Sequence, residues 1–124
     1  MNVLLVDDEQ ELVSALAERL GLRGIDATWT TSGQEAIALL EKQTFDIAVL
    51  DVKMPNMGGL ELKRRLEELQ PGLRFIFVTG HGSEEDFRTG SSEAASYLVK
   101  PVSIDALIVT MESALAQPLQ TGAR

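Results

Sequence analysis

Short apolar runs alternate along the chain with longer stretches in which apolar residues recur at helical spacing. Five runs are strand candidates, and three of them are almost entirely apolar: residues 2–6, 26–29, 46–50, 74–79 and 96–99. Three stretches between or after them carry leucine or methionine every three or four residues, which predicts helices: Leu12, Leu16 and Leu20; Leu62, Leu66 and Leu69; Leu107, Met111 and Leu115. The alternation predicts parallel crossovers in a three-layer α/β sandwich, with helices on both faces of one sheet.

Short polar motifs predict where the helices begin and end. Ser32, with Glu35 three residues later, forms a capping-box pattern that begins a further helix, and Ser103 is an N-cap candidate for the last one. Gly21 and Gly24 are expected to close the first helix.

The chain of 124 residues has the size of one domain. We assign residues 1–116 to that domain. Residues 117–124 are polar and broken by Pro118, which predicts a C-terminal tail or the start of a linker.

Charge and composition exclude several classes of function. The sequence has 19 Asp+Glu against 11 Lys+Arg, a net charge of -8, which argues against direct nucleic-acid binding by this domain. It has no cysteine, so thiol chemistry and thiolate metal sites are excluded. No apolar run is long enough to span a membrane and no signal peptide is recognisable, so we expect a cytoplasmic protein without membrane attachment.

Polar residues stand at the end of four predicted strands. Asp7, Asp8 and Glu9 follow the first strand, Asp51 the third, Thr79 the fourth, and Lys100 with Pro101 the fifth. In open α/β sheets the functional crevice lies beyond the carboxyl ends of the strands, so these side chains are expected to share one edge.

Neighbouring carboxylates are costly unless a cation binds among them, and hard oxygen ligands suit Mg²⁺ or Mn²⁺. The alternative is that Asp7, Asp8 and Glu9 only favour the N-terminus of the first helix. Thr79 and Lys100 favour the metal interpretation, because a hydroxyl and an ammonium beside a cation can bind a phosphoryl group. In that setting, Asp51 can act as a nucleophile and become an acyl phosphate.

The ordered set Asp7-Asp8, Asp51 with Met54-Pro55, Thr79-Gly80 and Lys100-Pro101 resembles the receiver domain of two-component response regulators, through Ala116. The resemblance implies a doubly wound, flavodoxin-like fold with a five-stranded parallel sheet of order 2-1-3-4-5. It also implies a phosphorylation-controlled switch that catalyses only its own phosphotransfer and dephosphorylation.

The resemblance implies a role for each site residue. Asp51 is expected to accept a phosphoryl group from a sensor histidine kinase or a phosphotransfer protein. Asp8 and Asp51 would bind Mg²⁺ directly, Asp7 through a water molecule, and Lys53 through its backbone carbonyl. Thr79 and Lys100 would contact the phosphoryl group.

Other family positions have open alternatives. Tyr97 corresponds to the switch aromatic that turns inward with Thr79, or is a half-buried strand residue. Pro101 corresponds to a proline preceded by a cis bond, or is a plain helix-start proline. Lys53 and His81 border the path of the hydrolytic water and are expected to tune dephosphorylation, although an isolated histidine is more often simply exposed.

One segment departs from the family pattern. Gly90, Ser91 and Ser92 favour helix poorly, and Glu93 stands near a usual glycine. We therefore expect a short or irregular fourth helix that ends near Gly90. The resemblance implies an output partner, either an attached domain or a separate protein, and a phosphorylation-dependent homodimer is one form of output.

Three other functions are alternatives to this switch. A flavodoxin would need hydroxyls and amides for a flavin phosphate where Asp7, Asp8 and Glu9 stand. A haloacid-dehalogenase-type hydrolase would need a second acid where Lys53 stands. A degenerate receiver that serves only as an interaction module is the nearest alternative, and it predicts missing site residues.

Overall fold

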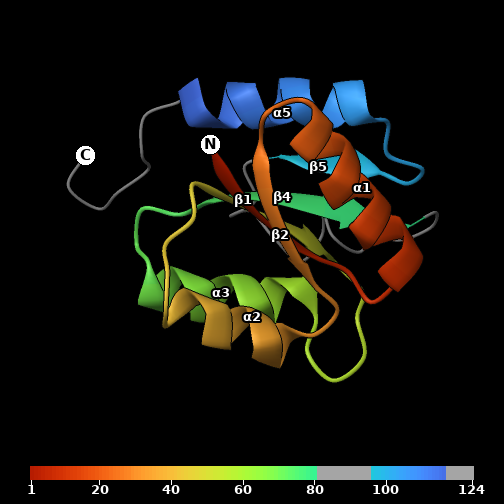
Figure 1. Cartoon of the computed structure of the whole chain (residues 1–124). Helices are drawn as coiled ribbons and strands as arrows, with labels where there is room; N and C mark the ends of the chain where they lie inside the picture. Colours follow the sequence, from red (N-terminus) through yellow and green to blue (C-terminus); the bar gives the residue numbers. More distant parts are fainter. Residues whose placement is uncertain (81–95, 117–124) are drawn as a thin grey trace.

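The computed structural model describes residues 1–80 and 96–116, and it contains one five-stranded parallel sheet (Figure 1). The strand order is β2-β1-β3-β4-β5, as predicted. The strands are β1 (Asn2–Val6), β2 (Asp26–Thr30), β3 (Ile47–Asp51), β4 (Arg74–Thr79) and β5 (Tyr97–Val99). Every predicted strand is present, with its ends within one residue of the expected position.

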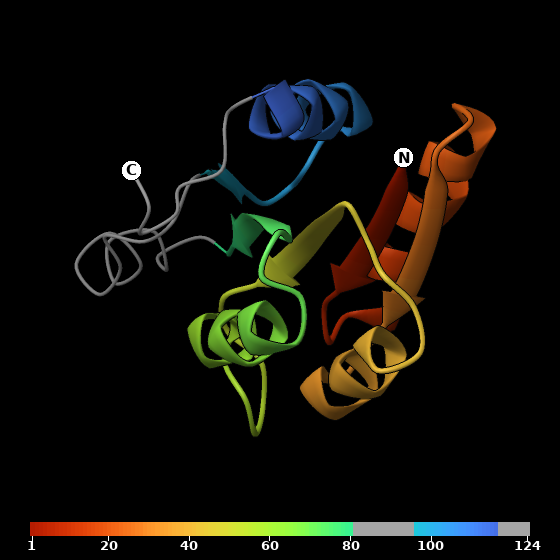
Figure 2. The same cartoon turned by 90° about the vertical axis from the view of Figure 1, so that its left-hand side faces the viewer.

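Helices cover both faces of the sheet, which confirms the three-layer sandwich. Helices α1 (Gln10–Leu22) and α5 (Ile104–Ala116) lie on one face, and α2 (Gly33–Leu40) and α3 (Gly59–Leu69) lie on the other (Figure 2). The expected short fourth helix falls within residues 81–95, outside the described residues, as does the tail at 117–124.

The sheet separates two hydrophobic clusters, because successive side chains of a strand point to opposite faces. On the α2/α3 side, the cluster includes Val6, Leu50 and Phe77. On the α1/α5 side, it includes Leu5, Val49 and Val78. The alternation continues to the next residue of each strand. Asp7 and Asp51 therefore lie toward the α1/α5 face, and Thr79 lies toward the α2/α3 face.

Two helix starts agree with the sequence, with one correction. The Ser103 hydroxyl accepts a hydrogen bond from the Ala106 N–H at 3.0 Å, and the Ser32 hydroxyl accepts one from the Glu35 N–H at 3.1 Å. A full capping box would also have the Glu35 side chain accept a hydrogen bond from the Ser32 N–H. That part of the prediction was wrong, because the Glu35 carboxylate accepts from the Thr30 hydroxyl and the Ser32 N–H donates to the Thr30 hydroxyl oxygen.

The end of α1 also differs in part. Gly21 lies inside the last turn of the helix rather than beyond it. Gly24 follows the helix with φ of 81°, a left-handed conformation that glycine adopts without strain, so Gly24 alone provides the expected turn.

Within residues 1–80 and 96–116, no helix has the length and apolar character needed to cross a bilayer.

Candidate functional site

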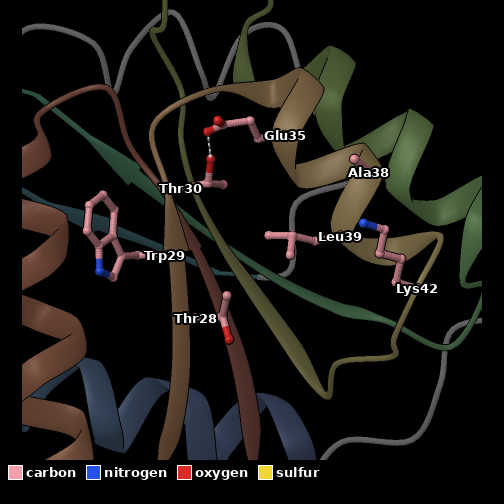
Figure 3. A pocket seen from close by; sticks show the side chains of 7 residues that line it. All are labelled: Thr28, Trp29, Thr30, Glu35, Ala38, Leu39 and Lys42. Carbon is pink, nitrogen blue, oxygen red and sulfur yellow. Dashed lines mark hydrogen bonds between the residues drawn. The ribbon is translucent and has the colours of Figure 1, made fainter.

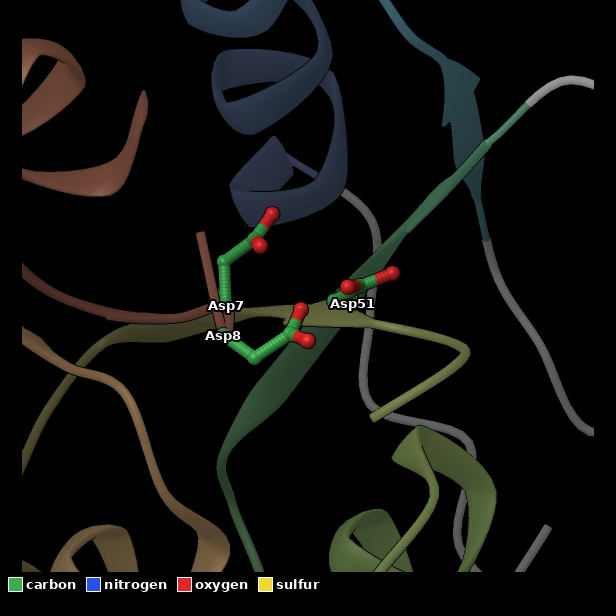
Figure 4. Close-up of side chains that lie close together, drawn as sticks. All are labelled: Asp7, Asp8 and Asp51. Atoms are coloured by element: carbon green, nitrogen blue, oxygen red, sulfur yellow. The ribbon is translucent and has the colours of Figure 1, made fainter. Parts of the chain in front are cut away.

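Three acidic side chains converge at the carboxyl ends of β1 and β3 (Figure 4). Asp7 and Asp8 follow β1 directly, and Asp51 is the last residue of β3. One carboxylate oxygen from each lies within 4.8 Å of the others. Asp7 and Asp51 are buried and Asp8 is exposed, so the group has a buried base and an open side.

Backbone N–H groups orient the two buried carboxylates. The Glu9 N–H donates to Oδ1 of Asp7 at 2.9 Å, and the Lys53 N–H donates to Oδ1 of Asp51 at 3.3 Å. The Asp7 N–H in turn donates to the Thr30 carbonyl oxygen at 3.3 Å, which joins the loop after β1 to the end of β2. The Asp7 and Asp51 side chains are therefore held by the turns that follow their own strands.

Gly59 lets the chain after Asp51 fold back closely. A Cβ atom at this position would collide with the carbonyl oxygen of Asp51. The Gly59 N–H donates to the Val52 carbonyl oxygen at 2.9 Å, so α3 begins directly against the end of β3. A residue without a side chain is required here by the close approach of two backbone segments.

Lys100 brings a cation to the acidic group from the end of β5. Its Nζ lies 3.0 Å from Oδ2 of Asp7, 3.6 Å from Oδ2 of Asp51 and 2.5 Å from Oε1 of Glu9. The Lys100 N–H donates to the Thr79 carbonyl oxygen at 2.8 Å, which ties the loop after β5 to the end of β4. The Lys100–Pro101 peptide bond is cis, as the resemblance implied.

Burial and mutual repulsion change the acidity of this group. Burial, and then the charge of Asp7, raise the pKa of Asp51 from 3.8 to about 7, against the lowering effect of Lys100. Burial also raises the pKa of Asp7. For Lys100, burial works to lower the pKa, but hydrogen bonds to Glu9 and Asp7 and the charges of Asp7 and Asp51 raise it overall. The carboxylates therefore have more negative charge than one lysine offsets.

Thr79 ends β4 with its side chain fully buried. Its hydroxyl has no hydrogen-bond partner within the described part of the chain. A buried hydroxyl without a partner is costly, which points to a ligand atom that this group would bind. Tyr97 is partly buried on β5, and it packs against the α2/α3 cluster on the face that Thr79 follows.

The arrangement suits a hard divalent cation and a phosphoryl group. Two buried acids and one exposed acid provide the oxygen ligands that Mg²⁺ prefers, with an open side for water. The geometry thus brings together Asp7, Asp8, Asp51 and Lys100, with Thr79 on the neighbouring strand. His81 lies outside the described residues.

Glu9 is the residue whose contact the sequence did not predict. The motif placed it beside the acidic pair, but no local pattern indicates a hydrogen bond with Lys100, which lies 91 positions away in the sequence. The parallel sheet brings the two loops together.

A separate pocket lies between β2 and α2, and it is distinct from the acidic group (Figure 3). Its lining includes Leu39, Lys42 and the hydrogen-bonded pair Thr30 and Glu35. None of the three acids at the strand ends contributes to it.

Known proteins resemble this chain over nearly its whole length. The model of the response regulator receiver domain matches residues 3–112. The transcriptional regulatory protein GlrR of Escherichia coli is 34% identical over 94% of this chain and 26% of its own length. The sensor histidine kinase RcsC of Salmonella typhi is 38% identical over 90% of this chain and 12% of its own length.

A solved structure agrees with the fold. The chemotaxis protein CheY4 of Vibrio cholerae superimposes with a TM-score of 0.83 and 28% identity, covering 92% of this chain and 98% of that chain. The chain spans between 26% and 50% of the length of the first curated relatives that it matches. It belongs to the family of response regulator receiver domains, the receiving modules of two-component signalling.

Proposed function

We propose that Asp51 is the phosphoryl acceptor of this receiver domain. The observation that carries the proposal is the convergence of Asp51 with Asp7, Asp8 and Lys100 at one edge of the sheet, beside a buried Thr79 hydroxyl that lacks a partner within residues 1–80 and 96–116. Each group has a defined task in phosphoryl transfer.

The reaction is a displacement at phosphorus. A carboxylate oxygen of Asp51 forms a bond to phosphorus while the bond from phosphorus to the donor breaks, giving an acyl phosphate on Asp51. With a phosphohistidine donor, the imidazole nitrogen leaves with the electron pair and takes up a proton. With acetyl phosphate, acetate leaves.

Asp7, Asp8 and Asp51, with the Lys53 carbonyl, would hold Mg²⁺ or Mn²⁺, which when bound neutralises charge that builds up on the phosphoryl oxygens. Lys100, whose Nζ lies 3.6 Å from Oδ2 of Asp51, would bind one of these oxygens. The Thr79 hydroxyl would donate to another, which would give it a partner that residues 1–80 and 96–116 do not provide. The open side at Asp8 gives the donor access to Asp51.

Three finer assignments complete the proposal. Movement of Thr79 toward the phosphoryl group would draw Tyr97 inward and alter the face formed by β5 and α5. The Lys53 and His81 side chains would set the rate of hydrolysis. We place the domain boundary after Ala116, and residues 117–124 would form a tail or link to an output domain.

The proposed partners are a sensor histidine kinase or phosphotransfer protein as donor, and an output domain or protein as receiver of the signal. The chain matches only 26% of the length of GlrR and 12% of the length of RcsC, which supports an output domain or a separate output protein. A cytoplasmic location and a phosphorylation-dependent homodimer remain predictions.

The test is mass spectrometry after incubation with acetyl phosphate and Mg²⁺. We expect one phosphoryl adduct on the unsubstituted protein, none on Asp51→Asn, and none when EDTA replaces Mg²⁺. Absence of an adduct on the unsubstituted protein would leave the degenerate interaction module as the better interpretation.

A further inference from the structure

The Glu9 side chain makes the shortest of the three contacts between Lys100 and an acid. Lys100 Nζ lies 2.5 Å from Oε1 of Glu9, against 3.0 Å to Oδ2 of Asp7 and 3.6 Å to Oδ2 of Asp51. Only the last of these distances exceeds the range of a good hydrogen bond. In this state, the close contacts of Lys100 are with the loop after β1, and its contact with the proposed acceptor is a longer ion pair.

Glu9 has no evident structural task that would explain this contact. It is the N-cap residue of α1, yet its side chain makes no capping hydrogen bond. The side chain is 60% exposed, so it adds little to the core. It also lies outside the group of three acids that can hold a metal ion.

We propose that Glu9 is a positioning residue that holds Lys100 away from Asp51 before phosphorylation and must release it afterwards. This inference rests on the proposed function, because it requires Lys100 to bind a phosphoryl oxygen on Asp51. The ammonium group would then exchange the Glu9 carboxylate for that oxygen.

A bound metal ion sharpens the role of Glu9. A divalent cation among Asp7, Asp8 and Asp51 would offset the charge of Asp7 and so weaken its attraction for Lys100. Glu9 lies outside that group of three acids, so the cation would offset the charge of Glu9 less than that of Asp7. Of the three acids in contact with Lys100, Glu9 is thus the competitor that persists when the site is loaded.

The strength of the ion pair between Glu9 and Lys100 sets how much its removal should change the affinity for a phosphoryl analogue. One partner is largely exposed, and ion pairs of that kind contribute little, so removing the Glu9 charge should tighten binding of a phosphoryl analogue about two- to fivefold. A weak competitor suits a switch, because a strong one would prevent Lys100 from reaching the phosphoryl group.

The experiment measures the affinity of the Mg²⁺-loaded protein for beryllofluoride, which mimics a phosphoryl group on a carboxylate. Glu9→Gln should bind more tightly by the factor above. Glu11→Gln removes the same charge from an exposed position two residues later, in the first turn of α1, and should bind as the unsubstituted protein does. An equal effect of both substitutions would reduce the result to general electrostatics and overturn the proposal, as would an unchanged or weaker affinity of Glu9→Gln.

A second readout reports the contact itself. The chain has lysine at only four positions, so ¹⁵N-lysine labelling gives few side-chain signals, and Lys100→Met identifies the one from Lys100. Without beryllium or fluoride, Glu9→Gln should shift the Lys100 ammonium signal and Glu11→Gln should not. An unmoved Lys100 signal in Glu9→Gln overturns the proposal.

The two levels of the proposal fail in different ways. If the unsubstituted protein does not bind beryllofluoride with Mg²⁺, the proposed function fails. If it binds and Glu9→Gln behaves like Glu11→Gln, the proposed function stands and the role of Glu9 is wrong.

Discussion

Lys100 Nζ lies 3.6 Å from Oδ2 of Asp51, close enough for charge attraction but too far for a good hydrogen bond. The lysine is the cation that the structure places among the buried acids, and it comes from a loop remote in sequence. Its charge offsets part of the repulsion between Asp7 and Asp51.

Replacing Lys100 by methionine should destabilise the metal-free protein. The substitution leaves buried carboxylates without their counter-charge, which we expect to cost about 2 kcal/mol of unfolding free energy, because the Lys100 side chain is only partly buried. Urea denaturation in EDTA measures this loss, and added Mg²⁺ should recover more stability in Lys100→Met than in the unsubstituted protein. Lys42→Met, away from the acids, is the control and should change stability little.

Asp51 should make the metal-free protein less stable as the pH rises. Its pKa is raised from 3.8 to about 7, so the folded protein binds this proton more tightly than the unfolded chain does. The resulting stabilisation is fully present below about pH 4 and is lost as the pH rises through about 7. Asp51→Asn lacks this titration and should be more stable than the unsubstituted protein by about 2 kcal/mol at pH 8, with a smaller difference in acid.

The measurement is the urea midpoint in EDTA as a function of pH. Asp105→Asn removes the same charge from an exposed side chain and should not reproduce the effect. A constant difference between Asp51→Asn and the unsubstituted protein at all pH values would contradict the raised pKa.

Thr79→Val should separate stability from phosphoryl binding. It replaces a buried hydroxyl, unpaired within the described residues, by a methyl group of similar size, so stability should be unchanged or higher by about 1 kcal/mol. Beryllofluoride affinity should fall, because the proposed hydrogen-bond donor to the phosphoryl group is lost. Thr79→Ser, which keeps the hydroxyl, should retain most of the affinity. A marked loss of stability in Thr79→Val would indicate that the hydroxyl already has a partner.

Gly59→Ala should disturb the site without touching an acidic side chain. The new methyl group would meet the Asp51 carbonyl oxygen, so the turn after β3 must move, at an expected cost of about 1–3 kcal/mol. Thermal unfolding gives the stability, and a Mg²⁺ titration gives the change at the acids. Gly72→Ala is the matched control, since no atom outside Gly72 and its two chain neighbours lies within 4 Å of the added Cβ. Equal effects of the two substitutions would refute the close-approach argument.

Much of the fold follows from local patterns. Apolar runs such as residues 74–79 have the length and composition of buried strands, and the Ser103 cap marks the start of α5. Strand-end arguments also predicted that Asp7, Asp51 and Lys100 would lie together, because parallel strands end at one edge. These features depend on periodicity and topology, which are legible in one sequence.

Other features depend on tertiary contacts that no local pattern encodes. The Glu35 carboxylate accepts a hydrogen bond from the Thr30 hydroxyl at the end of β2, and the Ser32 N–H donates to that same hydroxyl oxygen. The contact between Glu9 and Lys100 is set by the reach of two side chains across the sheet edge. Gly21 could serve a helix or its end equally well, and only the following turn at Gly24 decides.

The division of the core by the sheet has a consequence for how a signal travels. The sheet lies between the two clusters, so the side chains of one cluster do not pack directly against those of the other within the described residues. By the alternation of side chains along their strands, Asp51 lies toward the α1/α5 face of the sheet and Thr79 toward the α2/α3 face. A phosphoryl group on Asp51, as proposed, would lie at the rim between the two sides, so the edge of the sheet would be where a chemical event on one layer becomes a mechanical event on the other.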